Sequence, residues 1–142
     1  MKTAFSKLLA ISILTSIVIF SSSCKKYDDG PAFSMRSKKA RVAGEWTVAQ
    51  VLVNDADQTN AFYSFYPGYL IILDKEGKYT ERANGYPDEH GKWEFQRNKE
   101  EIYSLQDGAT VGQTLTLLRL KNREMWVTYM IGPDKYEVHY EQ

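Results

Sequence analysis

Few residues of this chain have the chemistry for catalysis or metal binding. It contains a single cysteine and two histidines. The first histidine, His90, ends the run Asp88-Glu89-His90, which places three metal-capable side chains in consecutive positions. Consecutive residues of a strand point to opposite faces of a sheet, so these three side chains cannot all reach one ion. We therefore expect no metal centre at this run.

The second histidine, His139, completes no catalytic arrangement. It alternates with Lys135 and Glu137, a period of two that predicts an outward imidazole in solvent. A serine or threonine nucleophile needs a histidine base within hydrogen-bond reach and an acid behind that base. No spacing in the chain suggests such an order. We predict that the protein is not an enzyme and uses no cofactor.

The cysteine follows a segment that is typical of a secretory leader. Lys2 and Lys7 lie near the start, and a thirteen-residue, mainly apolar run spans residues 8–20. That length suits a signal peptide and is well short of the ~20 residues that a membrane-spanning helix needs. Three serines then precede Cys24. We predict that residues 1–23 are a signal peptide.

A cysteine placed directly after small residues resembles a bacterial lipobox. In such lipoproteins the thiol takes a diacylglycerol, the chain is cut before the cysteine, and the new amine is acylated, for example with palmitate. The resemblance departs from the usual pattern at Ser21, where leucine is common. It implies that Cys24 is a lipidation site that anchors the protein to a membrane. The alternative is an ordinary secretory signal, whose free thiol would be prone to oxidation outside the cytosol.

Residues 24–36 are expected to be a flexible tether between the lipid and the folded domain. They show no periodicity and contain Gly30-Pro31. The pair Asp28-Asp29 resembles the acidic export signal of some Gram-negative lipoproteins. The resemblance implies the outer membrane of a Gram-negative bacterium, and it leaves the periplasmic face and the cell surface equally open.

The remainder has the size and charge of one small domain. Removing 23 of the 142 residues leaves 119, enough for one hydrophobic core. The removed part carries two lysines and no acid, so 18 basic residues fall to 16 against 18 acids, a formal charge of −2. This balance does not favour a nucleic-acid partner. With one cysteine there is no intrachain disulfide, and ten tyrosines, six phenylalanines and three tryptophans must contribute much of the core of an expected monomer.

Hydrophobic and polar residues alternate through most of the domain expected at residues 37–142. A short helical turn comes first, with Ser37 as its N-cap and Gly44 as its end. The period then changes to two, most clearly at 135–140, and the run 113–120 switches phase partway, which predicts a β-bulge. The eight expected strands are 45–54, 68–73, 77–82, 91–96, 101–106, 113–120, 124–131 and 135–141.

Short turns between these strands imply antiparallel neighbours in sequence order. A meander of eight strands has two unpaired edges, and closure into a barrel removes them. We therefore predict an all-β fold, an antiparallel up-and-down eight-stranded barrel, with a β-sandwich as the alternative. The bulky residues expected inside are Trp93, Phe95, Met125, Val127, Tyr129, Tyr136, Val138 and Tyr140.

One connection, residues 54–68, is too long for a hairpin. Asp57 or Thr59 is a suitable cap for a short helix that stops before Pro67. We expect this helix to fold across one end of the barrel as a lid. Its aromatic residues, the candidate ligand contacts, are Phe62, Tyr63, Phe65 and Tyr66.

The tripeptide from Gly44 to Trp46, "GEW", matches the lipocalin Gly-x-Trp motif. In lipocalins the tryptophan packs at the closed base of an eight-stranded barrel, and a long first loop covers the open end. The order lipobox, "GEWTV", "DQTNAF", "YPGYLIILDKEGKYT", "GKWEF", "LTLLRLKNREMWV" resembles the small lipocalin-like lipoproteins of Gram-negative bacteria. Arg119 and Arg123 are candidates for the arginine that caps this tryptophan in long lipocalins. The C-terminal helix of long lipocalins has no counterpart after the last expected strand.

Two functions remain open from these patterns. The resemblance implies a membrane-anchored barrel that binds a small hydrophobic or amphipathic ligand under the aromatic lid. Buried tyrosines favour an amphipathic ligand, because each buried hydroxyl needs a polar partner. Alternatively, the bulky inward residues fill the barrel completely. A filled barrel would be a surface interaction protein for a protein or glycan partner, or an inhibitor, using loops such as 86–91.

Overall fold

In the computed structural model, which describes residues 35–142, the fold begins with the short helix α2 (Lys38–Val42). Its N-cap is Ser37, as expected, because the Ser37 hydroxyl accepts a hydrogen bond of 3.1 Å from the backbone N–H of Ala40. The predicted signal peptide, Cys24 and the tether up to residue 34 lie outside the described residues. Within residues 35–142, no helix has the length and apolar character needed to cross a membrane.

Strands make up most of the described chain, and all of them belong to one antiparallel sheet. Helix α3 (Thr59–Phe65) lies between the second and third strands, and the one-turn 3₁₀ helix η2 (Arg97–Lys99) joins the fifth and sixth. The strands are β1 (Gly44–Val53), β2 (Ala56–Asp57), β3 (Leu70–Leu73), β4 (Lys78–Arg82), β5 (Glu89–Gln96), β6 (Glu101–Gln106), β7 (Gln113–Leu120), β8 (Glu124–Ile131) and β9 (Asp134–Glu141).

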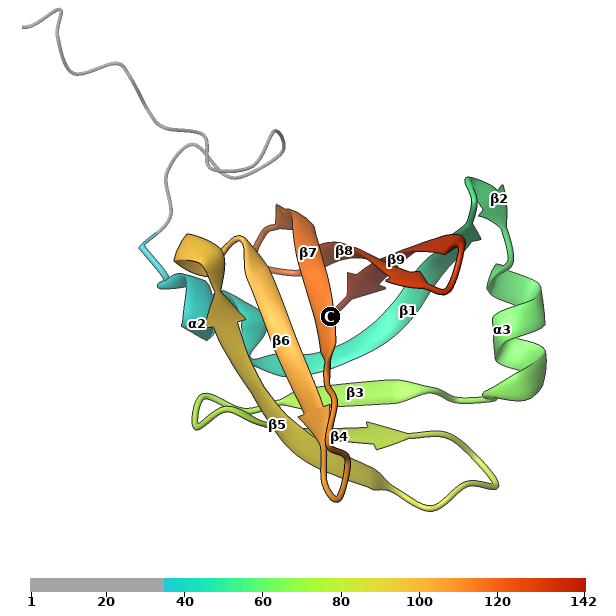
Figure 1. Ribbon diagram of the computed structural model, residues 1–142, viewed down its shortest axis with the longest axis horizontal. Coiled ribbons are helices and arrows are strands. Elements are labelled where there is room, and N and C mark those ends of the chain that lie inside the picture. The colour runs from blue at the N-terminus through green and yellow to red at the C-terminus, as the bar shows by residue number, and fades with distance from the viewer. Residues whose placement is uncertain (1–34) are drawn as a thin grey trace, which may run out of the picture.

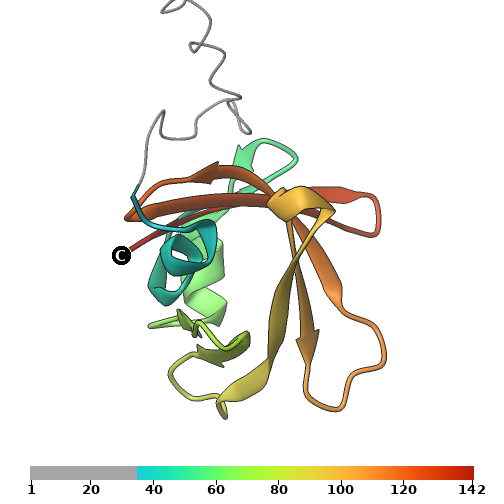
Figure 2. The same ribbon diagram turned by 90° about the vertical axis from the view of Figure 1, so that its left-hand side faces the viewer.

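The sheet closes on itself, because β1 pairs with β9 as well as with β3. The closing register runs from Thr47 opposite Glu141 to Val53 opposite Tyr136. Strands β1 and β3 to β9 therefore form an eight-stranded up-and-down barrel, and β2 is a short extra strand beside β1 (Figure 1; Figure 2). This confirms the lipocalin-like barrel with a helix in its first long loop and excludes the β-sandwich.

The sheet formed by the described residues contains two β-bulges, of which the sequence predicted one. The predicted bulge is confirmed, since the pairing of β7 with β8 shifts register between Leu117 and Arg119. A second bulge lies in β1 at Ala49, between Val48 and Gln50, and was not expected. Alanine is small enough to tolerate either face, so the extra residue leaves no clear break in the hydrophobic pattern.

The α2 end of the barrel is filled by side chains. Trp46 is fully buried there, and its indole Nε1 donates a hydrogen bond of 2.7 Å to the carbonyl of Val42. The buried arginine of α2 is Arg41, which donates to the carbonyl of Leu120 at 2.8 Å. Arg119, one expected cap, places its guanidinium over a different tryptophan, Trp126, at 4.1 Å from the ring centroid. The core is made by Val42, Trp46, Val48, Val51, Leu73, Tyr79, Trp93, Ile102, Leu117, Leu120, Met125, Val127 and Val138.

The other end of the barrel is covered by α3, and the two helices lie at opposite ends of the strands (Figure 1). Four of the residues expected inside, Trp93, Met125, Val127 and Val138, belong to the buried core, while Phe95, Tyr129 and Tyr140 are half-buried against it. Tyr136 stacks on Tyr129 with ring centroids 5.4 Å apart. The interior is thus apolar and closed near α2, and rich in tyrosine towards α3.

Candidate functional site

A cavity of about 260 Å³ lies between α3, the β4–β5 connection and the barrel interior, and we call it the mouth cavity. Five aromatic rings, two carboxylates and one arginine line it, together with an alanine and a proline. Its lining residues are Phe62, Tyr66, Tyr69, Glu81, Arg82, Ala83, Tyr86, Pro87, Glu89 and Tyr129.

The rings of the mouth cavity contact one another across three segments of the chain. Phe62 of α3 lies 5.3 Å from Tyr66 and 5.2 Å, edge to face, from Tyr69. Tyr66 also lies 5.7 Å from Tyr86, in the β4–β5 connection. Aromatic pairs at such separations attract each other beyond the area that they bury. The helix is therefore linked to the strand ends by ring contacts, and the cavity lies beside those contacts.

Polar bonds hold α3 over the mouth. The hydroxyl of Tyr63 donates a hydrogen bond of 2.5 Å to the carbonyl of Val48, and the hydroxyl of Thr59 accepts one of 3.0 Å from the N–H of Val51. The carboxylate of Asp57 accepts from the N–H of Thr59 at 2.9 Å. The hydrogen bonds from Thr59 and Gln50 lower the pKa of Asp57 to about 2. The start of α3 is therefore tied to β1.

The four aromatic residues expected in the lid thus have three different positions. Phe62 and Tyr66 line the mouth cavity, and Tyr63 bonds the helix to β1. The side chain of Phe65 is 68 % exposed and is not among the cavity residues. The helical period explains the split, since residues 62 and 66 share a face one turn apart.

Inside the mouth lies a carboxylate that was not predicted from the sequence. Glu81 of β4 accepts a hydrogen bond of 2.8 Å from the hydroxyl of Tyr69. Burial, followed by the negative charge of Glu89, raises the pKa of Glu81 against the opposing hydrogen bond. The available signal was the strand period, because Glu81 is two residues from the buried Tyr79 and so shares its inward face.

The second carboxylate, Glu89 of β5, lies directly opposite Glu81 in the sheet. Directly opposed residues of antiparallel strands have side chains on the same face, and like charges in such a pair are destabilising. None of the ion pairs found among residues 35–142 includes either glutamate. The cavity therefore contains two acidic groups with no cationic partner in the described part of the chain.

Tyrosine hydroxyls add to this polar interior. Burial, then Tyr136 and Glu81, raise the pKa of Tyr129 to about 12. Burial raises the pKa of Tyr140 further, and burial is also the main cause of the raised pKa of Tyr69. These phenols stay protonated at neutral pH and can donate hydrogen bonds to Glu81 or to a bound molecule.

The three side chains of the run Asp88-Glu89-His90 separate in the structure. Asp88 pairs with Arg82 at 2.8 Å, Glu89 lines the mouth cavity, and His90 lies 3.0 Å from the hydroxyl of Thr80. No group of three or more possible metal ligands forms within residues 35–142.

The prediction that the His139 imidazole lies in solvent is wrong. The side chain lies on the outer face of β9 but is only 14 % exposed. It stacks on Trp126 with centroids 4.0 Å apart and planes 12° apart, and it hydrogen-bonds Glu137 at 2.7 Å. The alternation of residues in the sequence predicted the correct face of β9 for His139. Side chains of the neighbouring strands pack on that face and cover the imidazole ring.

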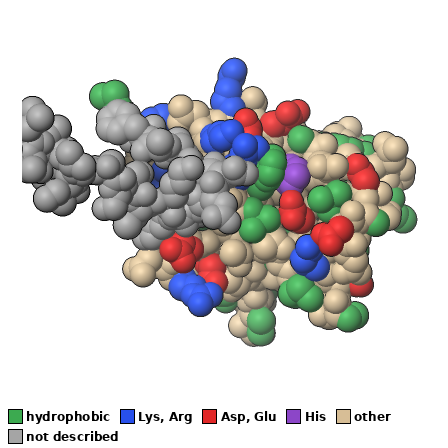
Figure 3. Space-filling model, turned by 90° about the horizontal axis from the view of Figure 1, so that it is seen from above, with side chains coloured by type: hydrophobic (Ala, Val, Ile, Leu, Met, Phe, Trp, Pro, Cys, Tyr) green, Lys and Arg blue, Asp and Glu red, His purple; other side chains and the backbone are tan. Residues whose placement is uncertain are grey.

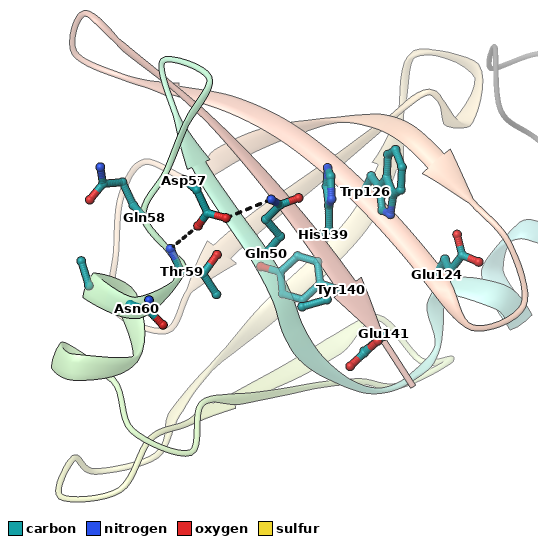
Figure 4. A pocket seen from close by; sticks show the side chains of 12 residues that line it. Gln50, Asp57, Gln58, Thr59, Asn60, Glu124, Trp126, His139, Tyr140 and Glu141 are labelled. Carbon is teal, nitrogen blue, oxygen red and sulfur yellow. Dashed lines mark hydrogen bonds between the residues drawn. The ribbon is translucent and has the colours of Figure 1, made fainter.

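A row of outward side chains crosses β7, β8, β9 and β1. Beside it lies a depression of about 790 Å³, and we call this depression the outer groove. Trp126 is opposite Arg119 on one side and His139 on the other, and His139 is opposite Gln50 of β1. Figure 4 shows the nearly parallel rings of Trp126 and His139, with Asp57 bonded to Gln50 and Thr59. The lining residues are Ala49, Gln50, Asp57, Gln58, Thr59, Asn60, Ala61, Glu124, Trp126, His139, Tyr140 and Glu141.

Charge does not concentrate on the visible side of the barrel. Seen from above, basic, acidic and hydrophobic side chains of the described residues are interspersed (Figure 3). Around the outer groove, Glu124 is already paired with Arg119 at 3.1 Å and with Lys121 at 3.8 Å. The groove is therefore a mixed polar and aromatic surface.

Comparison with known proteins gives no family for this chain, since it matches no family model and no curated protein. The lipocalin-like architecture describes the fold. Because one fold serves many functions, the function has to be argued from the two sites themselves.

Proposed function

We propose that this protein is a membrane-anchored lipocalin-like lipoprotein that binds a small amphipathic ligand in the mouth cavity. The observation that carries the proposal is the cavity itself, where the barrel interior is left open beneath α3. Ligand sites are typically concave and mostly apolar, with a few polar groups that fix orientation. The mouth cavity has this composition, with five rings and the hydrogen-bonded pair of Tyr69 and Glu81.

The volume limits what can bind. About 260 Å³ is slightly below the usual range for drug-sized molecules, ~300–1,000 Å³. A long-chain lipid would need more of the interior, and the α2 end is occupied by core residues such as Trp46 and Val127. The ligand is therefore small, with an apolar part against the rings and a polar part near Glu81.

Native mass spectrometry of the protein purified from its own host tests the proposal. We expect an extra mass that disappears on denaturation and that gives the mass of the ligand. In Phe62→Ala and Tyr66→Ala the bound fraction should fall severalfold, because both rings line the cavity. Phe65→Ala is the matched control, since Phe65 is exposed on the same helix. A bare polypeptide mass in every preparation, with no binding of added apolar probes, would count against a carrier.

The anchor is tested separately at Cys24. Cys24→Ala should leave the precursor uncleaved or release the protein from membranes, because no other cysteine in the chain can take the lipid. Ser23→Ala, at the neighbouring small position, is the control and should be processed normally. A Cys24→Ala chain that is processed and stays in the membrane fraction would contradict the lipoprotein proposal.

The outer groove supports a second candidate function, the binding of a glycan at the membrane surface. Its amide, hydroxyl and carboxylate groups surround an aromatic ring, and they come from β1, β2, α3, β8 and β9. A glycan array probed with the purified chain tests this directly. Asn60→Ala should abolish any signal that depends on the groove, whereas Asn84→Ala, in the β4–β5 connection, should leave the signal unchanged. The absence of any signal would remove this candidate.

A further inference from the structure

We propose that the ligand of the mouth cavity is a small organic cation, an ammonium compound held between the carboxylates of Glu81 and Glu89 and the surrounding aromatic rings. This inference rests on the proposed ligand-binding function and adds the charge and chemical class of the ligand.

The charge of the site is the first argument. Glu81 and Glu89 face each other across β4 and β5 in one cavity, without a cation among the described ion pairs. Two acidic groups so placed repel each other when both are ionised, and a cation bound between them offsets that repulsion by attracting both. An anionic ligand would add a third negative charge to the same space.

The one basic residue that lines the cavity does not cancel this charge. Arg82 is adjacent to Glu81 in sequence and therefore points to the other face of β4. Its guanidinium is paired with Asp88 at 2.8 Å, and the two side chains are 52 % and 40 % exposed. The Arg82–Asp88 pair is neutral as a unit, so the acidic character of the mouth comes from Glu81 and Glu89.

The rings supply the second argument. The faces of aromatic rings attract cations, and quaternary ammonium groups are bound in cages of such rings. The mouth cavity places Phe62, Tyr66, Tyr69, Tyr86 and Tyr129 around the space next to the carboxylates. A neutral apolar ligand would use the rings alone and would leave both carboxylates without an opposing charge.

The buried environment of Glu81 supports the same conclusion. Within residues 35–142 the carboxylate accepts one hydrogen bond, from Tyr69, so part of its capacity to accept hydrogen bonds is unused there. Burial and Glu89 both raise its pKa, which means that the empty site disfavours the ionised form. A cationic ligand favours the ionised form and should displace the proton where one is bound.

Three probes of nearly equal shape and different charge test the inference. They are choline, its neutral carbon isostere 3,3-dimethylbutan-1-ol, and the anion 3,3-dimethylbutyrate. Calorimetric titrations at neutral pH use the whole mature chain, residues 24–142, with Cys24→Ser so that no lipid attaches, after circular dichroism has shown β structure. We expect choline to bind at least about tenfold more tightly than the alcohol, and the anion to bind most weakly.

Matched variants assign the effect to the site. Glu81→Gln keeps the size and the acceptor for Tyr69 but removes the charge, and it should remove most of the tenfold preference for choline over the alcohol. Glu94→Gln, an exposed glutamate of β5, should leave the preference unchanged. Thermal unfolding of each variant shows whether the fold is kept, and Glu89→Gln gives an independent test if Glu81→Gln does not fold.

The outcomes separate the two proposals. Equal binding of choline and the alcohol, or preference for the anion, overturns the cation inference and leaves the ligand-binding proposal standing. A preference for choline that persists in both glutamine variants also overturns it. If none of the three probes binds, and a neutral naphthyl probe does not bind either, both proposals fail.

Discussion

Glu81 accepts a hydrogen bond of 2.8 Å from the hydroxyl of Tyr69, and the two residues lie at the open end of the β3–β4 hairpin. Tyr69 immediately precedes β3, and Glu81 lies near the end of β4, so the hairpin places both side chains at the mouth of the barrel. The same tyrosine contacts the ring of Phe62. One side chain therefore connects the polar group of the cavity to its helical cover.

The stability of the empty protein should depend on pH through Glu81. Its pKa is raised in the folded state, so the folded protein holds this proton more tightly than the unfolded chain does. That contribution to stability is present below the ordinary pKa and is lost as pH rises through the raised value. Glu81→Gln should therefore melt higher than the parent at neutral pH, and the difference should shrink towards pH ~4.

Melting curves of the two proteins across this pH range, recorded without ligand, provide the measurement. Glu94→Gln is the control, because an exposed carboxylate on the outer face should change the curves little. A Glu81→Gln protein that melts below the parent at neutral pH would show that the ionised carboxylate stabilises the empty fold, contrary to this prediction.

The inward tyrosines should resist ionisation in alkali. Burial raises the pKa of Tyr79 and of Tyr129 to about 12, and Tyr69 and Tyr140 are shifted in the same direction. A phenolate absorbance titration of the folded protein should leave at least these four tyrosines protonated near pH ~11, above their ordinary pKa of ~10. In denaturant all ten tyrosines of the chain should ionise together.

The raised pKa values of these tyrosines also make the stability of the folded protein depend on pH. Because the folded state keeps these protons and the unfolded chain releases them, the free energy of unfolding should fall as pH rises above ~10. Ionisation of all ten tyrosines near pH ~10, while circular dichroism still shows the folded barrel, would contradict the burial of these phenols.

Trp46 should contribute more to stability than Trp126. Trp46 is fully buried and its Nε1 donates to Val42, so Trp46→Phe leaves a cavity and an unpaired carbonyl. We expect a loss of about 1–3 kcal/mol in the free energy of unfolding by urea. Trp126→Phe keeps a ring against His139 on the outer face and should cost less than ~1 kcal/mol. Equal losses for the two variants would show that Trp46 does not hold α2 to the barrel.

The attachment of α3 should depend on Tyr63. Tyr63→Phe removes the hydrogen bond to the Val48 carbonyl and keeps the ring, so the barrel should remain folded while the helix opens more often. Hydrogen exchange of amides in α3 should speed up by about fivefold or more, as expected from the loss of ~1 kcal/mol. Phe65→Ala should leave the exchange rates of these amides nearly unchanged, apart from a small effect of the different helix propensities of phenylalanine and alanine. Unaltered exchange in Tyr63→Phe would show that the ring contacts alone hold the helix.

Much of the fold could be predicted from local patterns. Period-two alternation placed the strands within about two residues of their observed bounds, and three of the eight, β6, β7 and β8, match at both ends. Turn residues predicted antiparallel neighbours, and the length of the connection 54–68, its capping residues and Pro67 predicted the helix. The strand β2 was not expected, because a two-residue ladder held by a tight turn at Asn54 and Asp55 is too short to show a period.

The composition of the candidate site depended on tertiary structure. The period of two places Glu81 on the same face as Tyr79, but it gives no sign that rings from α3 and the β4–β5 connection line the space in front of that carboxylate. His139 was assigned to solvent because period two specifies a face, whereas the rings packed on that face come from other strands. Local alternation thus determined the strands and their faces; only closure of β1 onto β9 decided which side chains share the interior, since contacts between residues distant in sequence form only when the barrel closes.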